Sequence, residues 1–284
     1  MEMLPIYQLP VRQAFLIFIM FSVLGWISEV LYVGIFYEHK FVNRGFLHGP
    51  LCPIYGFGGV VILLLPAVLY KTWIPLFFAS MILCTAVEYF ASWIMEKLFH
   101  TRWWDYSHYK FNINGRICLL NSVLFGALGL VIIHFVYPYI LKLINWPGEL
   151  VIRVSSDVLA AALAVDLILT VRKLVDFSAS MEKIKTFGES LRDHYGNEAW
   201  FRGESFSEML ASVKEHALKE RLEQDIIASK EKISQNILDK IEKFQTARNK
   251  AAESFMIHFP TMKSVQYKDA LEHLKERVKA RLGK

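Results

Sequence analysis

The sequence predicts an all-α protein: a polytopic transmembrane helix bundle of about five spans, followed by a C-terminal amphipathic helical extension in the cytoplasm. Three observations lead to this prediction. The 284-residue chain is 54% hydrophobic with a mean hydropathy of +0.31, which is more apolar than an ordinary soluble protein. The apolar residues form long continuous runs up to about residue 176, and beyond it they recur at helical spacing. Two short polar segments, residues 43–56 and 102–119, lie between the apolar runs.

Five apolar runs meet or approach the ~20 residues that a helix needs to cross the hydrocarbon core of a bilayer. They are residues 13–36, 54–70, 75–98, 117–140 and about 150–171. The fifth is the weakest, because Arg153, Asp157 and Asp166 interrupt it. Its alanines would let neighbouring helices approach closely, so we expect a span that the other helices shield.

The basic residues near the ends of these runs predict the orientation, because cytoplasmic ends carry more Lys and Arg. In a five-span arrangement one side collects Lys40, Arg44, Lys97, Arg102, Lys110, Arg116, Arg172, Lys173, Lys183 and Lys185, and the other collects Arg12, Lys71, Lys142 and Arg153. The richer side is expected in the cytoplasm. The N-terminus then lies outside, and both polar segments and the C-terminal tail lie inside.

The sequence divides into a transmembrane domain, residues 1–176, and a cytoplasmic helical tail, residues 177–284. Ser205 and Glu208 have the spacing of a capping box at a helix start. An apolar stripe then predicts a long amphipathic or coiled-coil-like helix that ends before Pro260, and residues 271–282 predict a shorter terminal helix. This tail is expected to pack on itself or on a second copy, or to dock onto a partner or the membrane surface.

Polar groups lie at a similar predicted depth in four of the apolar runs. They are Glu29, Glu88, Asn121 and Asp166, each near the predicted cytoplasmic end of its run. Ionisable side chains at membrane depth are costly and indicate functional sites. On the third run Cys84, Glu88, Ser92 and Glu96 follow at four-residue steps and share a helix face that should look into the bundle.

Candidate partners for these buried carboxylates are Arg44, Arg116, His48 and Lys97, all from the same side. Two interpretations stay open: ion pairs that fix the order of the helices, or a polar pocket that receives a ligand headgroup or ion from the cytoplasmic leaflet.

The two polar segments suit such a pocket. In residues 43–56 the glycines and prolines predict a re-entrant or tightly folded interfacial loop, because irregular backbone near membrane depth must be buried in protein or line a polar cavity. In residues 102–119 the aromatic residues Trp103, Trp104, Tyr106 and Tyr109 are typical of the belt at headgroup level. A belt does not explain why Asp105, Asn112, Asn114 and Arg116 occur together with them.

Several classes of function find no support. The net charge of +5 arises from interleaved signs, which does not indicate a nucleic-acid-binding surface. The three cysteines and scattered histidines lack metal-ligand spacing, so neither a metal nor another cofactor is expected. There is no GxxxxGK[ST] phosphate loop and no GxSxG nucleophile elbow.

Four motifs in order resemble the bacterial ABC-transporter type IV, or CmpB-like, permease family. They are GWISEV around Glu29, NRGFLHGPLCPIYG, EYFASWIMEKLF and WWDYSHYKFNINGRICL, and the resemblance covers about residues 11–142. It implies a permease subunit that works with a separate ATPase. By similarity the motif positions are Glu29, Asn43, Arg44, Gly49, Pro50, Glu88, Glu96, Trp104, Asp105, Asn112, Gly115 and Arg116.

The leading hypothesis is therefore a cell-membrane permease-like protein, a homo-oligomer or part of a hetero-complex, with a cytoplasmic-side pocket for a polar or amphiphilic ligand. The acidic residues favour a cationic or zwitterionic ligand or a proton. The alternatives are an intramembrane enzyme acting on lipid headgroups, with Glu88 or Glu29 as base and His48 or Asp105 assisting, and a structural or regulatory membrane protein. The candidate ligand-binding residues are Glu29, Asn43, Arg44, His48, Glu88, Glu96, Asp105, Asn112, Arg116 and Asn121.

Overall fold

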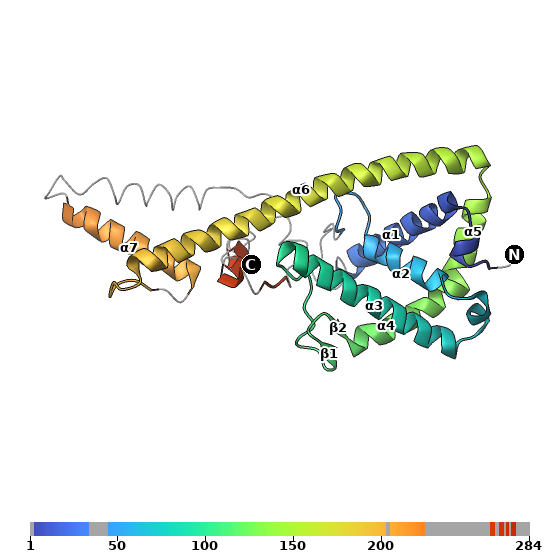
Figure 1. The fold of residues 1–284 in the computed structure, drawn as a ribbon, viewed down its shortest axis with the longest axis horizontal. Coiled ribbons are helices and arrows are strands. Elements are labelled where there is room, and N and C mark those ends of the chain that lie inside the picture. The colour runs from blue at the N-terminus through green and yellow to red at the C-terminus, as the bar shows by residue number, and fades with distance from the viewer. Residues whose placement is uncertain are drawn as a thin grey trace. The chain divides into compact units, whose positions relative to one another are not determined.

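The computed structural model describes residues 3–33, 45–202, 205–224 and, near the C-terminus, 262–264, 267–269, 271–272 and 274–276. Within these residues the chain is mostly helical (Figure 1). The elements are η1 (Ile6–Gln8), α1 (Val11–Val33), α2 (Pro53–Leu63), η3 (Ala67–Lys71), α3 (Ile74–Phe99), β1 (Asn112–Ile113), β2 (Ile117–Cys118), α4 (Leu119–Val131), the π-helix η4 (Ile132–Val136), α5 (Tyr137–Asn145), α6 (Glu149–Tyr195) and α7 (Phe206–Gln224).

Three helical segments are long and apolar enough to cross a membrane: Val11–Tyr32, Ile74–Phe99 and Leu119–Asn145. They coincide with the first, third and fourth predicted runs. The last of them is continuous although its backbone passes from α4 through η4 into α5. These three helices confirm the prediction of a multi-pass membrane protein.

The second predicted run does not form one long helix. Helix α2 has 11 residues, and at 1.5 Å per residue it is about 16 Å long, shorter than the ~30 Å hydrocarbon core. Pro66 is the N-cap of η3, and a residue before proline is disfavoured in the helical conformation. The expectation of a helix over residues 54–70 is therefore wrong in its extent.

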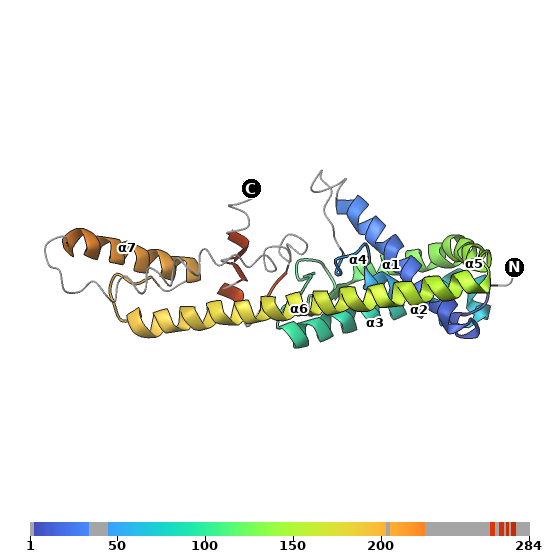
Figure 2. The same cartoon turned by 90° about the horizontal axis from the view of Figure 1, so that it is seen from above.

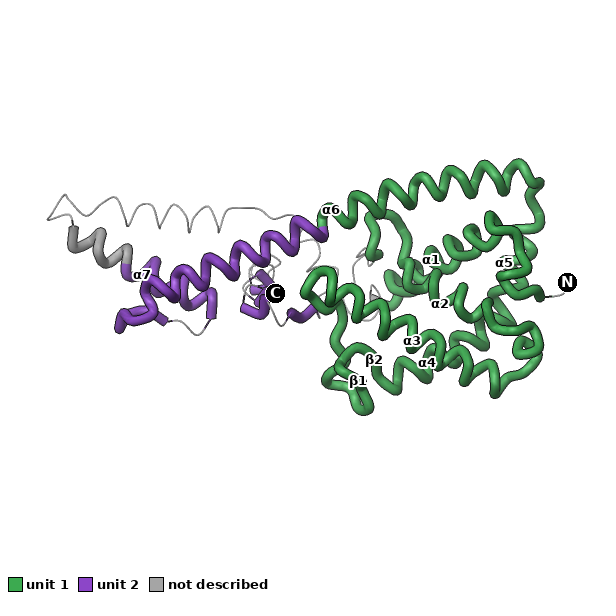
Figure 3. The backbone as a smooth tube through the Cα atoms, in the orientation of Figure 1, with its two compact units in different colours: residues 1–173 green, residues 174–284 purple. Residues whose placement is uncertain are grey.

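The fifth predicted run is the first part of α6, which has 47 residues and continues without a break to Tyr195 (Figures 1 and 2). The chain divides into two compact units, residues 1–173 and 174–284, and the boundary lies within this helix (Figure 3).

Small residues allow the helices of the first unit to pack closely. Gly56 and Gly59 of α2 face α1, where an added Cβ would lie 2.3 Å from Ser22 Oγ and 2.5 Å from the Phe21 ring, respectively. Gly129 of α4 is equally close to Ser80 of α3, and Thr85 donates a hydrogen bond of 2.9 Å to Ser122. Small residues at these contacts are typical of helix packing in membranes, where close backbone approach replaces the hydrophobic driving force.

The face of α3 predicted to look into the bundle is buried. Cys84, Glu88 and Ser92 are at most 9% exposed, as is Ser80 one turn earlier, in agreement with four-residue spacing along one helix face. Glu96, the last residue of the predicted face, is only partly buried, with a side chain that is 27% exposed.

In the second unit, α7 begins with the predicted capping box. The Glu208 amide donates to Ser205 Oγ and the Ser205 amide donates to Glu208 Oε2, both at 3.2 Å. Phe206 and Met209 are buried, and Phe206 lies against Gly188 of α6. The predicted stripe beyond residue 224, up to Pro260, lies outside the described residues.

Replacement of Gly59 by Ala should destabilise the protein by about 1–3 kcal/mol, because the new methyl group overlaps the Phe21 ring in a packed interface. Thermal unfolding in detergent measures the change. The matched control is Gly58→Ala on the same helix, where the nearest atom to an added Cβ is Cys84 Sγ at 3.8 Å and helix propensity favours alanine. Equal melting temperatures for the two variants would contradict the packing argument.

Candidate functional site

The polar segment between α3 and α4 folds into a small hairpin whose strands β1 and β2 pair in antiparallel register (Figure 1). Its turn requires glycine at Gly115, where φ is +67° and an added Cβ would lie 2.4 Å from Ser107 Oγ and 2.6 Å from Asp105 Oδ1. Asn112 stabilises the turn, because its side chain accepts from the Gly115 amide at 3.0 Å and donates to the Tyr109 carbonyl at 2.8 Å. The loop is therefore closed by its own polar groups.

Two arginines of this loop converge on one carboxylate oxygen of Glu96, near the end of α3. Arg102 Nε lies 2.9 Å and Arg116 Nη2 lies 2.8 Å from Glu96 Oε2. The three side chains are between 12% and 27% exposed, so the pairs are only partly screened by solvent. Arg116 also lies over the Tyr89 ring at 5.5 Å, a cation–π contact.

Asp105 is the most deeply buried charge of the loop, with a side chain that is 3% exposed. Its Oδ1 accepts hydrogen bonds from the Ser107 hydroxyl at 2.6 Å and the Ser107 amide at 3.3 Å. Arg102 Nη1 lies 3.8 Å from the same oxygen. Two carboxylates and two guanidinium groups thus neutralise one another in this cluster.

Glu88 lies deeper on α3 and is 6% exposed. Tyr106 of the loop donates a hydrogen bond of 3.1 Å to Glu88 Oε1. Burial, and next the nearby Glu88 carboxylate, raise the pKa of the Tyr106 phenol far above its usual range, so Tyr106 stays protonated as a donor. Among the described residues, the second oxygen, Oε2, has no hydrogen-bond partner.

Glu29 of α1 has a comparable arrangement. Tyr55 of α2 donates a hydrogen bond of 2.6 Å to Glu29 Oε1. The Glu29 carboxylate also contributes to raising the pKa of Tyr106, so it lies within electrostatic range of the phenol that binds Glu88. Glu29 and Glu88, 59 positions apart in the sequence, therefore lie at the same end of the first unit.

The other polar loop, after residue 45, is fastened to α6 by Asp166. The His48 and Gly49 amides donate to Asp166 Oδ1 at 2.9 Å and Oδ2 at 2.8 Å. The His48 ring nitrogen Nδ1 lies 3.0 Å from both Asp166 Oδ1 and Thr170 Oγ1. A carboxylate that accepts two backbone amides holds the loop much as an N-cap residue holds a helix start.

The predicted site residues thus fall into three groups at one end of the first unit. Glu96, Asp105, Asn112 and Arg116 form the ionic cluster and its supporting turn; Glu29 and Glu88 lie near Tyr106; His48 binds Asp166. Asn121, half-buried near the start of α4, makes no hydrogen bond with any described residue. Asn43 and Arg44 lie outside the described residues.

Two of the predicted partners lie against carboxylates of the predicted set: Arg116 pairs with Glu96, and His48 lies 3.0 Å from Asp166. The described hydrogen-bond partners of Glu29 and Glu88 are instead Tyr55 and Tyr106. Lys97 is exposed.

The aromatic-belt interpretation is also wrong for part of the loop. Trp103 is 2% exposed and packs edge-to-face on Phe46 and Phe99, and Tyr106 serves as the donor to Glu88. Sequence reasoning therefore missed Tyr55, Tyr106 and Arg102 as polar partners. Arg102 and Tyr106 lie in the same polar segment as Arg116, between two apolar runs, and this position could have identified them.

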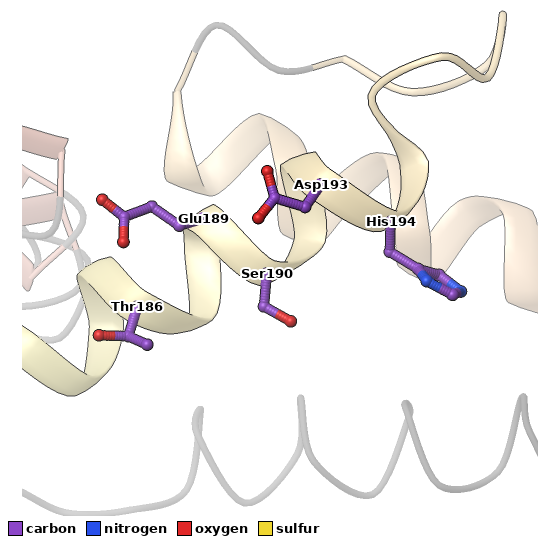
Figure 4. Close-up of a pocket in the computed structure, with 5 residues that line it drawn as sticks. All are labelled: Thr186, Glu189, Ser190, Asp193 and His194. Atoms are coloured by element: carbon purple, nitrogen blue, oxygen red, sulfur yellow. The ribbon is translucent and has the colours of Figure 1, made fainter.

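A pocket of about 450 Å³ lies elsewhere, in the second unit (Figure 4). The described residues that line it, Thr186, Glu189, Ser190, Asp193 and His194, all come from one side of α6, and none was a predicted site residue. No group of three or more His, Cys, Asp or Glu side chains within the described ranges is arranged to hold a metal ion.

Comparison with known families identifies the class of protein. The model of the family described as "Putative ABC-transporter type IV" matches residues 16–171, more than half of the 284 residues. The chain belongs to this family, as the four motifs indicated. The match extends beyond residue 142, where the resemblance of the motifs ends, and includes the first part of α6. No curated protein and no solved structure matches the chain.

Replacement of Glu96 by Gln should lower the free energy of unfolding by about 1–3 kcal/mol, because two partly buried guanidinium groups lose their common counter-charge. Thermal or denaturant unfolding measures this loss. Glu189→Gln is the control: its ion pair with Lys185 is exposed and 3.7 Å long, so the change should stay within about 0.5 kcal/mol. Equal effects would mean that the cluster adds nothing to stability.

Replacement of Asp166 by Ala should expose Cys52, the buried residue that ends the loop. Burial, together with the nearby Glu29 carboxylate, raises the pKa of the Cys52 thiol to about 12, so the wild-type residue should react slowly with a water-soluble maleimide. The reaction should accelerate at least about tenfold in the variant, since hydrogen bonds to charged groups contribute ~1.5–3 kcal/mol each.

The control is Asp157→Ala, which removes a different contact of α6, its ion pair with Arg12, and should leave the Cys52 rate unchanged. An unchanged rate in the Asp166 variant would refute the fastening role.

Proposed function

We propose that this chain is the membrane-embedded permease component of a transporter, and that the polar end of its first unit binds a polar or amphiphilic ligand carrying positive charge. Family membership and three apolar helices of membrane-spanning length support the general class. The observation that carries the proposal is the convergence of Glu29 and Glu88, from two different helices, on the surroundings of Tyr106.

The charge balance of the described residues favours a positive ligand. Glu96 and Asp105 are matched by Arg102 and Arg116. In contrast, the described partners of Glu29 and Glu88 are phenol hydroxyls, which donate a hydrogen bond but bring no positive charge. Carboxylates in apolar surroundings favour either a cation or a proton, because burial of an uncompensated charge costs several kcal/mol.

The proposed topology has five spans: the three long apolar helices, the first part of α6, and the interrupted segment of α2 and η3, because α2 alone is too short to cross. The apolar residues of α6 before the unit boundary support its assignment, since Leu150, Val158 and Ile168 are 72%, 62% and 54% exposed. Lipid would cover such a surface at no cost. Residues 1–176 are then the transmembrane domain, and residues 177–284 are the cytoplasmic tail, with the N-terminus outside because basic residues are fewer on that side.

A separate ATPase subunit and assembly as a homo-oligomer or hetero-complex belong to the same proposal. The sequence has no phosphate loop of its own, so a transporter of this class needs another chain to hydrolyse ATP.

The enzyme alternative receives less support. Its assisting residues, His48 and Asp105, form hydrogen bonds with Asp166 and Ser107.

The test is purification of the tagged full-length chain from its native membranes in mild detergent. We expect a stoichiometric ATPase subunit and ATP hydrolysis by the complex in liposomes. Glu88→Gln should keep the subunit and the melting temperature but lower ATP hydrolysis at least about tenfold, a loss of ~1.4 kcal/mol. Glu149→Gln, an exposed glutamate at the start of α6, should change neither.

Two outcomes would overturn the proposal. One is purification without any ATPase subunit. The other is turnover of lipid by the purified chain without ATP, which would favour the enzyme.

A further inference from the structure

Three buried oxygen atoms on one face of α3 lack hydrogen-bond partners among the described residues: Ser80 Oγ, Glu88 Oε2 and Ser92 Oγ. Glu88 and Ser92 are 6% and 1% exposed, whereas Ser80 lies two helical turns before Glu88, at the close contact with Gly129 of α4. Glu88 and Ser92 are one helical turn apart, so their Cβ atoms are separated by about 5–6 Å. Most buried polar side-chain atoms in proteins have a hydrogen-bond partner, and each exception calls for an explanation.

A metal cation explains this pair poorly. Hard cations need several oxygen ligands, about six or more for Ca²⁺ and Mg²⁺. No group of three or more metal-binding side chains occurs in the described part of the chain. Oε1 of Glu88 already accepts the Tyr106 hydroxyl, so a single carboxylate oxygen remains.

A proton explains it better, because it needs only one oxygen. When Oε2 carries the proton, the carboxyl is neutral, and the large cost of an unpaired charge in a water-poor interior disappears. The new O–H group then needs an acceptor, and Ser92 Oγ is the nearer unpartnered oxygen on the same helix face, one turn from Glu88, whereas Ser80 Oγ is two turns away. The separation of adjacent turns suits a bridging water, which would satisfy both atoms.

We propose that Glu88 is a proton-binding site, with the proton on Oε2 and a water that connects it to Ser92. This inference deepens the proposed function by naming the positive species. When the site empties, the O–H bond on Oε2 breaks, the carboxylate keeps the electron pair, and the bridging water accepts the proton.

Two titratable groups interact electrostatically with Glu88: Cys84 on the same helix face and Tyr106 of the loop. Tyr106 in turn lies within electrostatic range of Cys118 of β2 and Glu29 of α1. Burial and nearby negative charge raise the pKa of Tyr106 far above its usual range, so it remains a neutral donor throughout the physiological range.

Infrared spectroscopy of the purified full-length protein tests the proposal without requiring transport. At about pH 6 an exposed glutamate is ionised, so the carbonyl stretch of a protonated carboxylic acid should come from a buried group. We expect this band in the wild type and its absence in Glu88→Gln. Because this readout is independent of ATP, its failure would leave the permease proposal intact, and a missing ATPase would leave the proton site intact.

Two further variants test whether the band comes from a carboxyl group linked to Ser92. Ser92→Ala should keep the band but shift its frequency, since the carboxyl loses its indirect partner. Glu96→Gln should keep the band unshifted, because Glu96 is ion-paired with Arg102 and Arg116. A wild-type spectrum without the band, or a band that persists in Glu88→Gln, would overturn the proposal. Loss of the wild-type band on addition of Na⁺ at constant pH would also overturn it and indicate a metal cation.

Discussion

Polar groups inside an apolar helix bundle have little or no water to bind, so each must find its partner within the protein. The first unit meets this requirement mainly with the loops that connect its helices. Loop residues Arg102 and Arg116 bind Glu96 of α3, Tyr106 binds Glu88, and the loop before α2 gives two backbone amides to Asp166 of α6. The helix carboxylates hold the loops in place, and the hydrogen bonds and charges of the loops in turn lower the cost of burying those carboxylates.

The carboxylates at this end have different roles because their partners differ in charge. Glu96 faces two guanidinium groups and is part of a neutral, structural cluster. Glu29 and Glu88 face phenols, which leave the negative charge uncompensated. Spare negative charge in a low-dielectric interior attracts a cation or takes up a proton. For this reason the proposed chemistry centres on Glu29 and Glu88.

The extent of the family match agrees with a function located in the first unit. It runs from residue 16 to residue 171, which includes both polar loops and the carboxylates Glu29, Glu88, Glu96, Asp105 and Asp166, and it ends one residue after Thr170. The boundary between the two compact units follows at residue 173. The tail beyond it, with its capping box and its separate pocket, belongs to a part of the chain that the family model does not describe.

Local patterns in the sequence by themselves determined the three long apolar helices, the buried face of α3 and the start of α7 at Ser205, because hydropathy, four-residue spacing and capping act between neighbours in the chain. Two features of the sequence also indicate the observed helix ends. Pro66 interrupts the second apolar run, and the fifth run has no proline that would end its helix at residue 171. Only the tertiary structure decided which polar group meets which. Arg116 binds Glu96, and Tyr106 binds Glu88. These choices depend on distances between separate elements of the fold, and residue spacing along one helix does not determine such distances.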